Sequence, residues 1–229
     1  MYSILEKKLL AQKTTLFIVS AKKIAEKAEP GQFVVLRIEE QGERIPLTIA
    51  DTDTVKGTIS LVVQNAGYTT AKLTNLREGD SIPDIAGPLG RPTAIENIGT
   101  IAGVAGGIGI AALYPIIKRF KEQGATTISI LGARSKNFLF WEKRMHKVSD
   151  DFYITTDDGS YGKKGLVTAP LKELIQKHIP IDEVFAVGPT IMMKAVADTT
   201  LPYNIHTVAS LNPIMLDGTG MCGSCRVEV

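Results

Sequence analysis

The chain contains two cysteines, Cys222 and Cys225, and Asp217 lies five residues before the first of them in the glycine-rich stretch "LDGTGMCGSCRVEV". The spacing D-x4-C-x2-C matches the C-x4-C-x2-C run of plant-type [2Fe–2S] proteins, with aspartate in the first place. A carboxylate is a harder ligand than a thiolate, but it can ligate iron. The spacing predicts a [2Fe–2S] cluster on Asp217, Cys222 and Cys225, with a fourth, cysteine ligand beyond Val229 in a longer natural protein. The alternative is a dithiol pair beside an aspartate-capped turn.

A second group of residues suited to binding is the stretch "GVAGGIGIAALYPI" at residues 103–116. It follows a strand-like run, opens a helix-like run, and fits the spacing G-x-G-x-x-A at residues 107–112. Glycines at such a turn let phosphate oxygens reach the N–H groups of a helix N-terminus. The motif predicts a dinucleotide site, and a tight turn without a ligand is the alternative. In "GARSK" (132–136), Arg134 and Lys136 either contact the 2′-phosphate of a bound dinucleotide or belong to a solvated loop.

Three further stretches place polar groups or glycines where ligands bind. "NAGYTTAKL" (65–73) puts glycine and threonine at a helix start, where they either hold a diphosphate or form an ordinary N-cap. "TTDDGSYGKKG" (155–165) reads as a loop, and "VGPTIMMKAV" (187–196) as a turn followed by a helix. The second and third of these stretches each follow a strand of the expected parallel sheet, and ligands usually bind at the carboxyl edge of such a sheet. The two methionines of the last stretch are expected in the core.

Two kinds of element must position these residues. Short β-type runs alternate with turns before residue 97, which predicts an antiparallel barrel. Strands then alternate with helices, which predicts a parallel sheet covered on both faces. The expected domains are a barrel at 1–97, an α/β domain at 98–208 and an iron–sulfur segment at 209–229. The expected strands are 2–10, 14–20, 33–38, 47–51, 58–64, 100–105, 127–131, 152–156, 184–187 and 204–208, and the expected helices are 69–76, 111–122, 138–146, 167–177 and 191–197.

Composition narrows the classes of protein. The chain has 229 residues, of which 44% are hydrophobic, and a net charge of +2. This charge gives no electrostatic case for nucleic acid or an anionic membrane. The uncharged stretch 97–117 is interrupted by five glycines and Pro115, which favours a buried strand, turn and helix over a membrane span. With no signal-peptide pattern and only two cysteines, we expect a cytoplasmic protein.

Four stretches together, "AGGIGIAALYPI", "DDGSYGKKG", "VGPTIMM" and "SLNPIMLDGTGMCGSCRV", resemble the ferredoxin reductase superfamily. Within it the chain is similar to electron-transfer subunits related to sulfide dehydrogenase and dihydroorotate dehydrogenase. The dihydroorotate dehydrogenase subunits have a cysteine where this chain has Asp217. That position favours the branch of sulfide dehydrogenase and NADH-dependent reduced ferredoxin:NADP oxidoreductase.

The resemblance implies a set of binding residues. Many members of the superfamily have an arginine three residues before a serine or threonine, with an aromatic residue between them. In this chain Arg44 stands four residues before Thr48 with no aromatic residue between them, which leaves the role of Arg44 open. The implied ligands of the flavin ring of FAD are Pro46, Leu47 and Thr48, with Thr48 near N5; those of the FAD diphosphate are Gly67, Thr69 and Thr70; those of NAD(H) or NADP(H) are Gly106, Gly107, Ile108, Gly109, Asp157, Asp158, Gly188 and Pro189; and those of iron are Asp217, Cys222 and Cys225.

The resemblance also implies a function. Such a subunit transfers hydride between a pyridine nucleotide and FAD and passes single electrons through the cluster, so no acid–base residue is required. The implied partner is a larger flavoprotein with [4Fe–4S] clusters, in a heterodimer that reacts with ferredoxin and bifurcates electrons. Two alternatives remain: an electron-transfer subunit of dihydroorotate dehydrogenase, and a non-catalytic nucleotide-binding subunit that regulates a partner.

Overall fold

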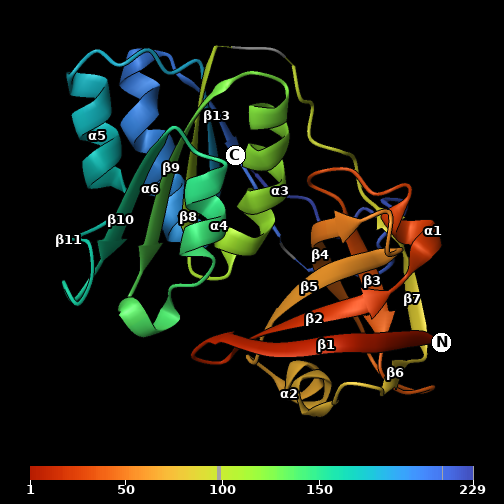
Figure 1. The fold of residues 1–229 in the computed structure, drawn as a ribbon. Helices are drawn as coiled ribbons and strands as arrows, with labels where there is room; N and C mark the ends of the chain where they lie inside the picture. Colours follow the sequence, from red (N-terminus) through yellow and green to blue (C-terminus); the bar gives the residue numbers. More distant parts are fainter. Residues whose placement is uncertain (97–98, 213, 229) are drawn as a thin grey trace. The chain divides into compact units, whose positions relative to one another are not determined.

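The chain forms two compact units, each built around its own sheet (Figure 1). The structure, a computed structural model, describes residues 1–96, 99–212 and 214–228. The first unit comprises Met1–Thr93 together with Asn212–Val229, and the second comprises Ala94–Leu211. The C-terminal segment therefore belongs to the first unit by its contacts. The domain boundary expected at 97/98 lies outside the described residues.

The first unit is a nearly closed antiparallel barrel of seven strands in the order β6-β1-β2-β5-β4-β3-β7. Alternate side chains point into it, so on β4 the residues Ile45, Leu47 and Ile49 pack on the core while Arg44, Pro46 and Thr48 alternate with them. The elements of this unit are β1 (Tyr2–Ala11), β2 (Thr14–Ser20), α1 (Lys22–Ala25), β3 (Phe33–Arg37), β4 (Arg44–Asp53), β5 (Thr58–Gln64), α2 (Tyr68–Asn75), β6 (Ser81–Ile82) and β7 (Asp84–Leu89).

The second unit is a parallel six-stranded sheet in the order β11-β10-β9-β8-β12-β13. Its first strand, β8, lies in the middle, so the chain adds strands first to one side and then to the other. The elements are β8 (Thr100–Gly106), α3 (Gly109–Glu122), β9 (Thr126–Ala133), a 3₁₀ turn η1 (Lys136–Phe138), α4 (Glu142–Lys147), β10 (Asp151–Thr156), β11 (Lys163–Lys164), α5 (Thr168–Gln176), β12 (Glu183–Val187), α6 (Thr190–Thr200), a 3₁₀ turn η2 (Leu201–Tyr203) and β13 (His206–Ala209).

Helices cover both faces of this sheet: α3 and α4 lie on one face, and α5 and α6 on the other (Figure 1). The helix α3 packs closely because Gly103 has no side chain, and a Cβ there would come 2.7 Å from Ile117 Cδ1. On the other face Leu171, Leu174 and Val196 complete a core with the even-numbered side chains of β8. Both faces of the central strands β8, β9 and β12 are therefore buried, which is why these strands read as continuous apolar runs.

The expected barrel and parallel sheet are both present, and β2 and β5 begin and end where the sequence predicts. Some local predictions were wrong. No strand or helix was expected between residues 76 and 100, but β6 and β7 lie there. The loop expected at 155–165 contains the short strand β11. The helix expected at 138–146 is divided into η1 and α4, because Trp141 between them has a left-handed backbone with φ +55°.

Within the described part of the chain, no helix is both long enough and apolar enough to cross a membrane. The uncharged stretch after residue 97 contributes β8 and the first half of α3 in its described part.

Candidate functional site

The most constrained place in the second unit is the carboxyl edge between β8 and β12, where the strand order reverses. Open α/β sheets bind ligands in the crevice at this point. The turns after the two strands approach so closely that only glycine fits. A Cβ on Gly109 would lie 2.2 Å from Val187 O, and a Cβ on Gly188 would lie 3.0 Å from Gly106 N. The structure therefore brings together the two glycine turns that the sequence predicted separately.

Gly107 is the open member of this group. Its backbone has φ +55°, and a Cβ added there would have no atom within 4 Å. Its N–H donates to Gly132 O at 3.0 Å, which ties the turn to the end of β9. Ile108 follows as the N-cap of the 14-residue helix α3. The N–H groups of Ile110 and Ala111 donate to Gly107 O and Ile108 O, and those of Ile108 and Gly109 precede them, so this turn can bind an anion that approaches over Gly107.

The loops after β9 and β10 reach the same edge and are joined to each other. Asp158 N donates to Arg134 O at 3.2 Å, and Lys136 N donates to Ser160 Oγ at 2.9 Å. The side chains of Arg134, Asp157 and Asp158 are exposed. Hydrogen bonds from Ser160, first from its hydroxyl and then from its N–H, lower the pKa of Asp158. The edge thus offers an exposed cation and a carboxylate that stays ionised.

In the first unit, β4 separates its candidate residues by face. Ile45 and Leu47 pack on the barrel core. Arg44, Pro46 and Thr48 alternate with them and therefore share the opposite face. The spacing of four residues between Arg44 and Thr48 is even, so it keeps the guanidinium and the hydroxyl on one side of the strand. Leu47, which was expected at the flavin with its neighbours, is half-buried and packs against the barrel core.

The start of α2 lies beside the start of β4. Thr69 Oγ1 donates to Glu43 Oε2 at 2.7 Å. Thr70 Oγ1 accepts from Gly67 N at 2.9 Å and caps the helix. Both hydroxyls therefore have protein partners, as in an ordinary N-cap. A Cβ added to Gly67 would meet no atom within 4 Å, so the backbone at this position is open to a ligand.

The C-terminal loop is organised by the carboxylate of Asp217. Its Oδ1 accepts from Thr219 N at 2.8 Å and from Gly220 N at 3.2 Å, and its Oδ2 accepts from Cys222 N at 2.9 Å. These backbone N–H groups, that of Thr219 foremost, lower the pKa of Asp217. The loop can turn this tightly because Gly218, Gly220 and Gly223 all have positive φ.

Both thiols of the loop are exposed and free. Hydrogen bonding from Ser224, first from its hydroxyl, lowers the pKa of the Cys222 thiol and favours the thiolate that metals bind. The loop rests on the barrel, since a Cβ on Gly218 would come 2.9 Å from Val35 Cγ2 and 3.4 Å from Leu89 Cδ1.

The donors of the loop suit an iron–sulfur group in kind, but they do not converge. Among the described residues, no three ligand-type side chains come together as a metal would need. The carboxylate of Asp217 is turned toward the loop N–H groups, although Oδ2 accepts one bond and keeps a second lone pair. The loop therefore carries residue types that can ligate iron, but its described side chains do not form a metal site.

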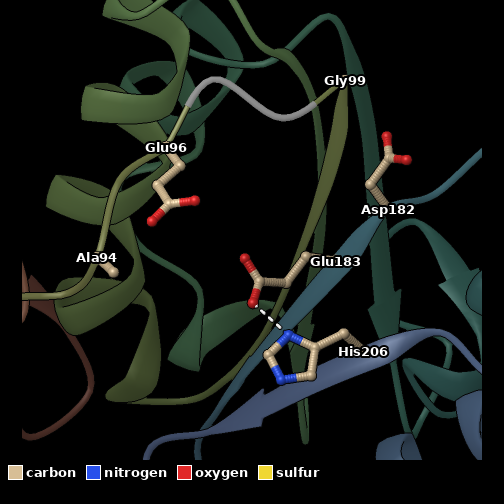
Figure 2. Close-up of a pocket in the computed structure, with 6 residues that line it drawn as sticks. All are labelled: Ala94, Glu96, Gly99, Asp182, Glu183 and His206. Carbon is tan, nitrogen blue, oxygen red and sulfur yellow. Dashed lines mark hydrogen bonds and ion pairs between the residues drawn. The ribbon is translucent and has the colours of Figure 1, made fainter.

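A cavity of about 510 Å³ lies elsewhere, at the amino ends of β8, β12 and β13 (Figure 2). There His206 Nδ1 pairs with Glu183 Oε1 at 2.6 Å, a contact that the sequence did not suggest. Asp182 Oδ2 accepts from Thr100 N at 2.6 Å and supports the start of β8. This edge is opposite the glycine turns, so the cavity is separate from the candidate nucleotide site. Its lining residues are Ala94, Glu96, Gly99, Asp182, Glu183 and His206.

Comparison with known proteins agrees with this division. Residues 2–93 match the oxidoreductase FAD-binding domain family. The chain is 46% identical to a dihydroorotate dehydrogenase B (NAD(+)) electron transfer subunit homolog of Thermotoga maritima, over 99% of this chain and 79% of that protein. It is 31% identical to the dihydroorotate dehydrogenase B (NAD(+)) electron transfer subunit of Geobacillus thermodenitrificans, over 99% of this chain and 88% of that protein.

Solved structures show the same likeness. The structure of an NADH-dependent reduced ferredoxin-NADP oxidoreductase superposes with a TM-score of 0.93 at 45% identity, over 99% of this chain and 81% of that one. Phthalate dioxygenase reductase superposes with a TM-score of 0.71 at 18% identity, over 91% of this chain and 67% of that one, which shows the shared fold.

A barrel of the FAD-binding kind followed by a parallel sheet with a glycine-lined switch point defines a reductase of the ferredoxin reductase class. Within that class, the chain belongs to the family of dihydroorotate dehydrogenase B electron-transfer subunits and their homologues.

Proposed function

We propose that this chain passes electrons between NAD(P)H, FAD and a [2Fe–2S] cluster to a larger flavoprotein subunit, in ferredoxin:NADP transhydrogenation with electron bifurcation. The observation that carries the proposal is the likeness along 99% of the chain to the structure of an NADH-dependent reduced ferredoxin-NADP oxidoreductase. The glycine-lined switch point of the second unit and the free thiols of the C-terminal loop add independent support.

For FAD, the outward face of β4 and the start of α2 are the proposed binding surface. The flavin, when bound, supplies the exchange between two-electron and one-electron carriers. Pro46 and Thr48 on β4 would line the ring, with the Thr48 hydroxyl near N5, and Leu47 would contribute its backbone. Arg44 shares their face and would place its guanidinium toward the diphosphate. Gly67 opens the helix start, and Thr69 and Thr70 hold its shape through their own hydrogen bonds.

For the pyridine nucleotide, the turn at Gly106–Gly109 would hold the diphosphate at the N-terminus of α3. The open space over Gly107 fits this role, since any side chain there would occupy the approach. Gly188 and Pro189 would border the other half of the crevice. Asp157, Asp158 and Arg134 lie on the loops beside the ribose end. We propose NAD(H) as the nucleotide, in line with the NADH dependence of the similar oxidoreductase.

For iron, Asp217, Cys222 and Cys225 are the proposed ligands. The two exposed thiols and the lowered pKa of Cys222 support thiolate ligation, and the remaining lone pair of Asp217 Oδ2 supports a carboxylate ligand. The side chains of the described residues do not converge on a metal ion.

A second candidate is the electron-transfer subunit of a dihydroorotate dehydrogenase. The names of the relatives in Thermotoga maritima and Geobacillus thermodenitrificans favour it. The two candidates share every cofactor and differ in the larger subunit, which is either a flavoprotein with [4Fe–4S] clusters or a dihydroorotate dehydrogenase.

The test is purification of the complex from the native host, followed by flavin, iron and subunit analysis. Under the first proposal the chain co-purifies with a larger iron–sulfur flavoprotein, and the complex reduces ferredoxin only when NADPH and NAD⁺ are both present. A partner that oxidises dihydroorotate would replace the first candidate with the second. A chain that carries no flavin and takes up none would refute both, and would leave a nucleotide-binding regulatory subunit.

A further inference from the structure

The ring of Tyr68, the first residue of α2, is exposed and is held in place from one side. The exposed fraction of Tyr68 is 76%. The Lys72 ammonium lies 4.5 Å from the centre of the ring, in a cation–π contact. The two residues are four apart in one helix, so their side chains share one face of α2. An aromatic ring that is held by a cation and is otherwise open can stack on a flat ligand.

Lys72 is itself fixed by the turn between β3 and β4. Its Nζ donates to Glu39 Oε1 at 2.7 Å. The hydrogen bond to Glu39, and next the one to Tyr68, raise the pKa of Lys72, so the ammonium stays charged. The ring is therefore oriented by two contacts in series. Less conformational entropy is lost when a ligand stacks on a ring that is already oriented.

The position of Tyr68 assigns it to one end of a bound FAD. The preceding residue is Gly67, whose open backbone is the proposed diphosphate position. The start of α2 adjoins the start of β4 through the hydrogen bond from Thr69 to Glu43. The flavin ring is proposed further along β4, at Thr48, so the riboflavin half extends along β4 away from α2. The other group on the diphosphate is adenosine, and it is left on the side of Tyr68.

We propose that the Tyr68 ring is the stacking surface for the adenine of FAD, and that it makes the chain prefer FAD over FMN. A purine has two flat faces, and its stacking on an aromatic side chain changes affinity by roughly fivefold or more. This inference rests on the proposed FAD site of the first unit. It adds a residue that was not among those expected to bind FAD.

The test compares FAD and FMN on full-length protein from which flavin has been removed. FMN has the flavin ring and one phosphate but lacks adenosine. In Tyr68→Ala we expect the Kd of FAD to rise at least about fivefold, and the Kd of FMN to stay within about twofold of wild type. Tyr68→Phe keeps the ring and should retain the wild-type FAD affinity. Tyr68→Leu keeps only apolar bulk and should behave like Tyr68→Ala.

Tyr203→Ala is the matched control, because Tyr203 is also an exposed tyrosine, at 53%, and belongs to the second unit. It should change neither Kd. Lys72→Met removes the cation beside the ring and keeps the stem of the side chain, so the Kd of FAD should rise less than in Tyr68→Ala. Both tyrosines are surface residues, so their substitutions should leave the fold intact, and thermal unfolding of each variant checks this.

Equal weakening of both flavins in Tyr68→Ala, or no weakening of FAD, would overturn the proposal. So would a Tyr68→Leu variant that binds FAD as tightly as Tyr68→Phe does, because the contact would then not depend on an aromatic ring. Failure of the underlying function gives a different result, because wild-type protein would then bind neither FAD nor FMN.

Discussion

Replacing Gly107 with valine isolates the contribution of one open backbone position to nucleotide binding. Gly107 has φ +55°, and a Cβ there would meet no protein atom within 4 Å. The substitution therefore creates no clash inside the protein, and its cost to folding is the left-handed backbone. That cost is roughly 1–2 kcal/mol for an L-residue, which corresponds to a fall in Tm of roughly 2–8 °C for a chain of this size.

The effect on binding should be larger than the effect on folding. The new isopropyl group stands where the diphosphate is proposed to approach the N-terminus of α3. We expect the Kd of NAD⁺ to rise by at least about tenfold, equivalent to about 1.4 kcal/mol. The FAD content should stay at the wild-type level, because the FAD-binding family match lies in the other unit.

Gly124 provides a matched control at the other end of α3. It also has a positive φ, +89°, and a Cβ there would also meet nothing within 4 Å. Gly124→Val should therefore lower Tm by a similar amount while leaving NAD⁺ affinity unchanged. Thermal unfolding and calorimetric titration of both variants measure the two effects. Wild-type affinity in Gly107→Val, or equal loss of affinity in Gly124→Val, would refute the assignment of this turn to the nucleotide.

Three further predictions concern other parts of the chain. Asp217→Cys should shift the EPR signal and the reduction potential of the reduced, iron-loaded full-length protein. Asp217→Asn is the control, because it keeps an acceptor for the loop N–H groups. Unchanged spectra in Asp217→Cys would mean that Asp217 is only a turn residue. Thr48→Val should retain FAD but slow its reduction by NADH about two- to tenfold, the value of one hydrogen bond, and an unchanged stopped-flow rate would contradict that role. Hydrogen bonds from the Lys121 ammonium, and next from the Thr127 N–H, lower the pKa of Asp150 below its usual value of 3.8. The ionised carboxylate therefore stabilises the fold above about pH 4, and this contribution is lost as the pH falls through the lowered pKa. Asp150→Asn should therefore cost less than about 1 kcal/mol at pH 7, since the pair is partly exposed, and the cost should shrink as the pH falls below about 4; a urea-unfolding difference that does not shrink in acid would contradict this.

The fold could be predicted well where a strand has two buried faces or a regular alternation. The strands β8, β9 and β12 are continuous apolar runs, and β2 and β5, which are also buried on both faces, lie between clear turn signals. The strand β7 was missed because Gly87 and Pro88 lie inside it. Proline removes a ladder hydrogen bond and normally argues against a strand, but β7 is the last strand in the sheet order, where an edge tolerates it.

The candidate nucleotide site could be predicted in part from the order of strands and helices along the chain. The carboxyl ends of parallel strands share one edge, so the residues after β8, β9, β10 and β12 could be expected on the same edge of the sheet. The sequence does not reveal which strands are neighbours, and so it did not show that Gly109 touches the end of β12. The two methionines of α6 were expected in the core: Met193 is part of it, and the half-buried Met192 packs against it.

The path of the chain has a consequence for biosynthesis. Because the last segment returns to the unit that contains the N-terminus, the second unit is an insertion between two parts of the first. A ribosome delivers the barrel strands first, then the whole parallel sheet, and only afterwards the loop with Asp217 and the cysteines. Domains tend to fold as units during synthesis. The loop that packs beside Val35 and Leu89 therefore emerges when its supporting wall is already in place. Under the proposal that this loop ligates iron, its thiols would meet the metal on a folded surface, not on a nascent coil.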